Sequence, residues 1–223
     1  MSEGAYSPAP AQAPHSGAAH PPGRRPQRVD RADYEAIAAW IRPGSTVLDL
    51  GCGDGTLLRH LRETRQVRGY GIEIEDDKVI ACVAAGVSVI QGDLERGLAD
   101  FDTSSFDYVI LSLTLQAVRN TEGIVLEMLR VGREGIVTFP NFGYWRHRLQ
   151  VISGRMPVTV NLPFQWYNTP NVHLCTIRDF EEFCRQRSIR ILQRLVLNDR
   201  APVAALPNLL GSLAVYRFER AGL

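Results

Sequence analysis

The chain has 223 residues, of which 45% are hydrophobic, and a formal net charge of +1. This is enough apolar material for one well-packed core, and the near-neutral charge argues against nucleic acid as a partner because no broad basic field is present to gather phosphates. No apolar run approaches the roughly 20 residues that cross a bilayer, so no membrane association is expected. The four cysteines form no C-x-x-C pair, which indicates reduced thiols in a cytoplasmic protein and no metal site.

Two parts of the chain differ in composition. Residues 1–28 are rich in Ala, Pro, Gly and Ser and offer little that could be buried, so we expect a flexible tail there. Residues 29–223 are expected to form a single domain that begins with a helix. Apolar side chains lie at helical spacing from Tyr34 to Ile41, and Pro43-Gly44 ends that helix.

Strands and helices then alternate along the chain. Short apolar runs predict seven strands, at 47–50, 67–72, 87–90, 106–111, 135–139, 189–197 and 213–218. Helices are predicted through 57–61, 76–85, 124–129 and 180–184. Gly86 is placed to end the second of these, and Thr176–Asp179 has the pattern of a capping box for the last.

This alternation requires right-handed crossovers between parallel strands, with helices on both faces of the sheet. We therefore expect a three-layer α/β fold. Its sheet should be mainly parallel and seven-stranded, with one antiparallel strand contributed by the late pair.

A glycine-rich turn, Gly51-Cys52-Gly53-Asp54-Gly55, follows the first strand, at the sheet edge where such folds bind ligands. It fails the dinucleotide pattern G-x-G-x-x-G because Thr56 stands at the sixth position, and no Gly-Lys-Ser/Thr follows that would make a P-loop. Asp49 and Asp54 would repel a pyrophosphate. Two carboxylates suit a ligand that is cationic at this point, with a sulfonium and an ammonium group.

Two further carboxylates follow the second and third strands. Glu73 can accept both hydroxyls of a ribose, with Ile74 against the adenine, and Asp93 can accept from an exocyclic amine. Each acid alone could instead be a helix cap or a solvated loop residue, and for Asp93 the two interpretations are about equally probable. The glycine-rich turn, Glu73 and Asp93 follow three successive strands in this order, and together they favour an adenosine-containing ligand.

The stretch Val47–Gly55, together with Glu73 and Asp93, resembles the class I S-adenosylmethionine-dependent methyltransferases over roughly residues 30–220. The resemblance implies a Rossmann-like methyltransferase fold that binds S-adenosyl-L-methionine or S-adenosyl-L-homocysteine. The residues that we assign to this ligand are Asp49, Gly51, Cys52, Gly53, Glu73, Ile74, Asp93, Leu94 and Leu111.

No catalytic residue can be identified from the sequence. Ser112–Asn120, the loop after the fourth strand where a base is usually found, contains no His, Asp, Glu or Lys. Asn161–Phe164 superficially resembles the N-P-P-F/Y motif of amino methyltransferases, but it follows the fifth strand rather than the fourth. His147 and His173 are candidate bases, although a lone histidine is more often structural.

Residues 140–176 form a connection longer than is usual in a compact domain. They hold six of the chain's 18 aromatic residues (8 Phe, 7 Tyr and 3 Trp). The segment can be a lid, a substrate pocket or a surface for another protein, since interfaces favour Trp, Tyr and Arg. The residues expected to form this partner or substrate face are Tyr144, Trp145, Arg146, Trp166, Tyr167 and His173.

A narrower resemblance lies in four stretches: Leu113–Val118, Phe139–Arg146, Gly154–Thr159 and Trp166–Thr176. They resemble the MetW family of methionine biosynthesis proteins, over roughly residues 30–200. That family acts beside a homoserine O-acyltransferase (MetX type), so the resemblance implies an accessory or regulatory subunit that supports this enzyme. An active methyltransferase acting on a small molecule is the alternative, and a nucleic-acid methyltransferase is the least expected.

Overall fold

The computed structural model describes residues 32–222, so the tail expected at 1–28 lies outside the described residues. The described strands form one sheet in the order β3-β2-β1-β4-β5-β8-β6-β7. Their bounds are β1 (Thr46–Leu50), β2 (Arg68–Glu73), β3 (Val89–Gln91), β4 (Phe106–Ser112), β5 (Gly132–Pro140), β6 (Ile189–Asn198), β7 (Ala201–Pro202) and β8 (Leu213–Arg220).

The sheet is mainly parallel, as predicted. The pairs from β3 through β5 are parallel, and β8 runs antiparallel to both of its neighbours, β5 and β6. All seven predicted strands are present, but the predicted number was one too few for a sheet of eight strands. The additional strand, β7, contributes only Ala201 and Pro202 to its pairing with β6, which is too short to leave a periodic pattern.

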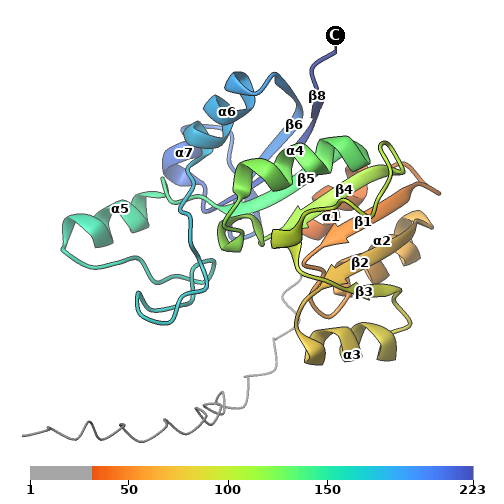
Figure 1. Ribbon diagram of the computed structural model, residues 1–223. Coiled ribbons are helices and arrows are strands. Elements are labelled where there is room, and N and C mark those ends of the chain that lie inside the picture. Colours follow the sequence, from red (N-terminus) through yellow and green to blue (C-terminus); the bar gives the residue numbers. More distant parts are fainter. Residues whose placement is uncertain (1–31, 223) are drawn as a thin grey trace, which may run out of the picture. The chain divides into compact units, whose positions relative to one another are not determined.

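Helices cover both faces of the sheet (Figure 1). They are α1 (Ala32–Trp40), α2 (Thr56–Arg65), α3 (Asp76–Ala84), α4 (Thr121–Val131), α5 (Trp145–Ile152), α6 (Ile177–Gln186) and the short α7 (Pro207–Leu210), with 3-10 turns η1 (Leu94–Arg96) and η2 (Leu115–Ala117). Side chains of β4 alternate between the two faces: Tyr108 and Ile110 pack into the core under α1, α2 and α3, whereas Val109 and Leu111 pack into the core under α4 and α6. The three layers are confirmed.

Local signals fix the ends of several helices. The predicted capping box of α6 is present, with Thr176 and Asp179 each accepting from the other's backbone N–H. The Asn120 side chain accepts from Gly123 N at the start of α4, and Gly86 follows α3 at φ +68°. These polar side chains satisfy backbone donors that the first turn of a helix leaves unpaired.

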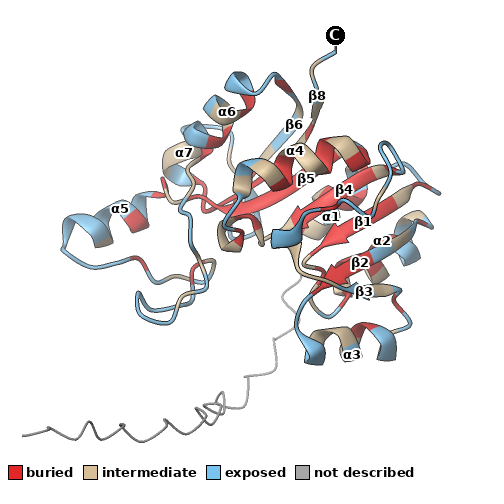
Figure 2. Ribbon diagram, in the orientation of Figure 1, coloured by how far each residue is buried: buried red, intermediate tan, exposed pale blue. Residues whose placement is uncertain are grey.

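Residues 140–176, predicted as irregular throughout, contain helix α5. The sequence did not reveal α5 because its one fully buried residue is His147, so no apolar stripe marks a core-facing side. The helix extends away from the sheet, and the loop after it leads back to the strand ends (Figure 1); both are largely exposed (Figure 2). Within 32–222, no helix combines the length and the hydropathy that a membrane span requires.

Candidate functional site

A cavity of about 460 Å³ opens at the carboxyl ends of the parallel strands. Loops after β1, β2, β3 and β4 line it, and a further wall comes from 164–171 of the long segment after β5. Five of the nine residues predicted to hold the ligand line this cavity: Gly51, Glu73, Ile74, Asp93 and Leu94. The sheet brings them together because strands that run parallel end at the same edge.

The glycine-rich loop is held against the end of β2. Gly51 and Gly53 adopt φ values of +67° and +59°, a conformation that side chains with a Cβ rarely adopt. Gly51 N and Cys52 N both donate to Ile72 O, at 2.8 and 3.0 Å. A Cβ on Gly51 would also collide with the Thr114 side chain, so this backbone lies open to the cavity only because the residue is glycine.

Glu73 organises the loop as well as lining the cavity. Its side chain is buried, and its Oε2 accepts from Gly53 N at 2.8 Å. Its Oε1 accepts from Ile74 N at 2.8 Å and from Glu75 N at 3.1 Å. A carboxylate has about four lone-pair positions, so Oε2 keeps one for a ligand hydroxyl while all three backbone bonds remain. The predicted binding of two ribose hydroxyls would require release of one backbone bond.

The other four predicted ligand residues do not line the cavity. Asp49 is only 2% exposed at the end of β1, and Leu111 is fully buried in the core under α4 and α6. Gly53 supports the loop, and Cys52 points its Sγ toward Cys82 Sγ at 3.8 Å. Burial and the nearby Asp49 carboxylate raise the pKa of the Cys52 thiol, so Cys52 is held as a neutral thiol rather than as a nucleophile.

Asp93 both lines the cavity and caps a helical turn, the two alternatives considered from the sequence. It lines the cavity, and its Oδ1 also accepts from Glu95 N at 2.9 Å as the N-cap of η1. The carboxylate is therefore fixed in orientation at the cavity wall by a backbone bond.

Several cavity residues were not predicted as ligand residues. They come from three places: charged residues in the segments that follow β2 and β3, η2 with its flanks, and the long segment after β5. They are Glu75, Lys78, Glu95, Leu113, Thr114, Gln116, Ala117, Val118, Phe164, Pro170 and Asn171. Sequence periodicity places the carboxyl ends of strands, but it carries no signal for the path of a long irregular segment back to the sheet.

The predicted partner or substrate face is mostly on the surface. Trp166 and Tyr167 are 72% and 70% exposed, with their rings edge to face at 5.8 Å. Trp145 is 37% exposed, and the Arg146 guanidinium lies 5.4 Å from its ring centroid. Tyr144 differs from the other aromatic residues because it is buried at the base of α5.

The two candidate histidines are both held by hydrogen bonds. His147 is fully buried; its Nδ1 lies 3.1 Å from Asn141 O and its Nε2 lies 3.0 Å from Thr159 Oγ1. Burial lowers the pKa of His147, which favours the neutral ring. His173 is exposed, and its Nε2 lies 2.9 Å from Arg119 O. Neither histidine lines the 460 Å³ cavity.

The strand order and the antiparallel β8 beside β5 define the fold of the S-adenosylmethionine-dependent methyltransferases. Two solved members superpose on the chain: one from Mesorhizobium loti (18% identical, TM-score 0.64, covering 86% of this chain and 100% of that one) and one from Aquifex aeolicus (13% identical, TM-score 0.60, covering 86% and 92%). At these identities the similarity establishes the fold alone, and it confirms the predicted class I methyltransferase fold.

Within that fold, the chain belongs to the MetW family: residues 31–218 match the family described as methionine biosynthesis protein MetW. It is also 38% identical over 202 residues to the bifunctional methionine biosynthesis protein MetXA/MetW of Rhodopirellula baltica, an alignment that covers 84% of this chain. The chain spans 32% of the length of that relative.

Proposed function

We propose that this chain is an S-adenosyl-L-methionine-binding accessory subunit that binds and supports a homoserine O-acyltransferase of the MetX type in methionine biosynthesis. The observation that carries the proposal is the Rhodopirellula baltica relative, whose name joins MetXA and MetW in one protein. Domains that are fused in one organism commonly act together as separate chains in another. We therefore propose a MetX-type enzyme as the partner of this chain.

The cavity suits an adenosyl ligand with a positive charge. Asp49 is buried beneath the glycine loop, and Glu73 and Asp93 face the cavity, so negative charge surrounds the place where a sulfonium or ammonium group would lie. Glu73 Oε2 has one lone-pair position left for a ribose hydroxyl, and Ile74 and Asp93, which line the same cavity, would hold the adenine. S-adenosylmethionine, when bound, supplies an activated methyl group; S-adenosylhomocysteine lacks it.

The partner surface is proposed on α5 and the loop that follows it. Of the 19 large hydrophobic side chains that are exposed in the described residues, 12 lie between 145 and 174. They are Trp145, Leu149, Val151, Ile152, Met156, Val158, Val160, Phe164, Trp166, Tyr167, Val172 and Leu174. Exposed apolar side chains gathered in one segment favour an interaction site there, and Trp and Tyr are among the residues that most often dominate binding energy.

Co-purification with the acyltransferase tests the proposal. The wild-type chain should form a stable complex and raise the activity of the enzyme. Tyr167→Ala should weaken the complex by about tenfold or more, whereas Tyr70→Ala serves as a matched control, because Tyr70 is 49% exposed on β2 and lies outside the proposed surface. Trp145→Ala and Trp166→Ala should behave like Tyr167→Ala. Calorimetry with S-adenosylmethionine should give nearly unchanged affinity in all four variants.

Two results would contradict the proposal. A wild-type chain that leaves the acyltransferase unbound and its activity unaltered rules out the accessory role. Equal loss of complex formation and ligand affinity in the Trp166→Ala and Tyr167→Ala variants would instead make this segment part of a substrate pocket.

Methyl transfer to a small molecule is the second candidate function. It is favoured by an apolar pocket that adjoins the adenosyl cavity and shares Gln116 with it. Turnover of methyl-labelled S-adenosylmethionine in the presence of a candidate metabolite would establish it.

A further inference from the structure

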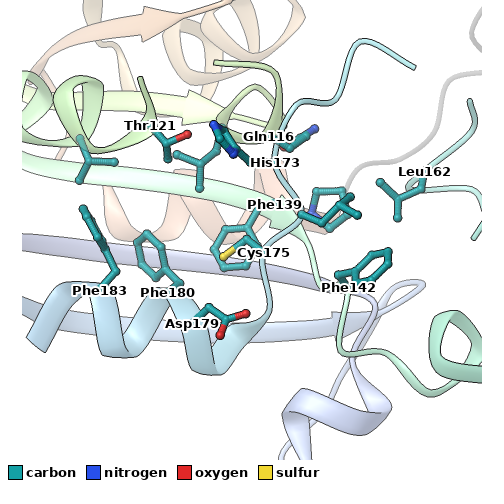
Figure 3. A pocket seen from close by; sticks show the side chains of 14 residues that line it. Gln116, Thr121, Phe139, Phe142, Leu162, His173, Cys175, Asp179, Phe180 and Phe183 are labelled. Atoms are coloured by element: carbon teal, nitrogen blue, oxygen red, sulfur yellow. The ribbon is translucent and has the colours of Figure 1, made fainter. Parts of the chain in front are cut away.

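An apolar pocket of about 250 Å³ lies between the end of β5 and α6 (Figure 3). Four phenylalanines form much of its wall: Phe139 on β5, Phe142 just after it, and Phe180 and Phe183 on α6. The Phe139 and Phe180 rings pack against each other at 5.2 Å.

The polar side chains of the pocket are already engaged elsewhere. His173 Nε2 lies 2.9 Å from Arg119 O, and Thr121 Oγ1 donates to Val118 O at 3.1 Å. The Asp179 carboxylate accepts from Thr176 in the capping box of α6. The lining residues include no Lys or Arg, so an anionic ligand would lose its hydration on entry without compensation.

Gln116 also offers the pocket no polar atom. Its Nε2 donates to Leu113 O at 2.8 Å, and its Oε1 is buried, without a hydrogen-bond partner among the described residues, and presents no accessible surface to the pocket. The surface that the pocket presents is therefore that of Phe, Leu and Val side chains.

The outer wall of the pocket is fixed by backbone hydrogen bonds. Val172 N and His173 N both donate to Gln116 O, at 2.8 and 3.0 Å, and Phe142 N donates to Cys175 O at 3.0 Å. These bonds hold residues 172–175 between η2 and the end of β5. The pocket is formed before a ligand enters, which reduces the entropy cost of binding.

We infer that this pocket binds a small, uncharged, predominantly apolar molecule, about the size of one substituted aromatic ring. A 150 Å³ apolar cavity is enough to hold benzene, and 250 Å³ leaves room for a short substituent. The inference goes beyond the proposed function and does not depend on it, because occupation of this pocket can be measured with no adenosyl compound in the adjoining cavity.

Toluene and benzoate test the inference on the full chain, because they share a ring but differ in charge. Calorimetry should give saturable toluene binding that is at least about tenfold tighter than benzoate binding. Leu174→Trp should weaken toluene binding by about tenfold or more, since the 46% exposed Leu174 lines the pocket and a larger ring there fills it. Leu149→Trp is the matched control, because Leu149 is 54% exposed on α5 and outside the pocket.

A second measurement keeps the test valid if Leu174→Trp does not fold. Amide chemical shifts of Thr121 and Leu174 in the wild-type chain should move on addition of toluene. The inference is wrong if toluene binding does not saturate, if those shifts do not move, if benzoate binds as tightly, or if Leu174→Trp and Leu149→Trp bind toluene equally. It is also wrong if these amides change only when the acyltransferase binds, since the pocket would then receive a side chain of that protein. Failure in any of these ways leaves the titration with S-adenosylmethionine untouched.

Discussion

The Glu73 carboxylate gives the sharpest test of the adenosyl site, through the isosteric change Glu73→Gln. The amide oxygen can retain the bonds from Ile74 N and Glu75 N, but its NH2 group then faces Gly53 N–H, where Glu73 Oε2 now accepts at 2.8 Å. One buried donor is left unsatisfied, at about 1–3 kcal/mol, and two charge-assisted bonds become neutral bonds of roughly half the strength. We expect a total loss of about 2–4 kcal/mol in the free energy of unfolding.

The same substitution removes the proposed ribose acceptor. Loss of a hydrogen bond to a charged group, about 1.5–3 kcal/mol, corresponds to S-adenosylmethionine affinity weaker by roughly tenfold to a hundredfold. Glu75→Gln is the matched control: Glu75 lines the same cavity but is exposed and pairs with Lys78 at 2.7 Å, so its stability cost should stay below about 1 kcal/mol.

Urea unfolding and calorimetry report the two effects separately. If Glu73→Gln unfolds at the same urea concentration as Glu75→Gln, the carboxylate does not hold the glycine loop. If it binds S-adenosylmethionine as tightly as the wild type, Glu73 is not a ligand acceptor.

Three further predictions concern the structure around the site. Asn141→Ala should lower the free energy of unfolding by about 3–5 kcal/mol, measured by urea, because the fully buried side chain hydrogen-bonds four backbone groups. Burial lowers the pKa of His147, so stability should fall as the pH drops below the ordinary value of about 6.5; urea midpoints at pH 7.5 and 5.5 should show this fall, and His147→Gln should reduce it. Gly71→Ala should cost about 1–3 kcal/mol in a thermal melt, since a Cβ on Gly71 would overlap Cys52 Sγ.

The fold was predictable because its signals are local. The apolar runs of β1 to β6 and β8 and the capping box of Thr176 and Asp179 each lie within a few residues of sequence. By contrast, β7 is too short to show a period, and α5 has no apolar stripe to bury. Tyr144 was assigned to the partner or substrate face, and in the structure it is buried and its ring packs edge to face against His147 at 5.4 Å, a contact that no spacing rule reveals.

The residues of the candidate site also fall into a group that the sequence could predict and a group that it could not. Gly51, Glu73 and Asp93 could be placed in one cavity because each lies at or within two residues of the end of a strand, and the sheet topology brings strand ends together. Phe164 and Asn171 could not, because they reach the cavity through a segment whose course is set by tertiary contacts rather than by periodicity. The functional roles of these residues remain predictions that the experiments above address.

The segment after α5 contributes both to the proposed adenosyl site and to the proposed partner surface. Phe164 and Asn171 line the adenosyl cavity, while Trp166 and Tyr167, between them in sequence, are exposed on the proposed partner surface. A partner that binds those two rings therefore acts on a wall of the cavity. Because such coupling is reciprocal, the acyltransferase should change S-adenosylmethionine affinity by the same factor as the ligand changes affinity for the acyltransferase, roughly 5- to 150-fold. Calorimetric titration of the free chain and of the complex with S-adenosylmethionine measures that factor. Equal affinities in the two titrations would mean that ligand binding does not influence the partner.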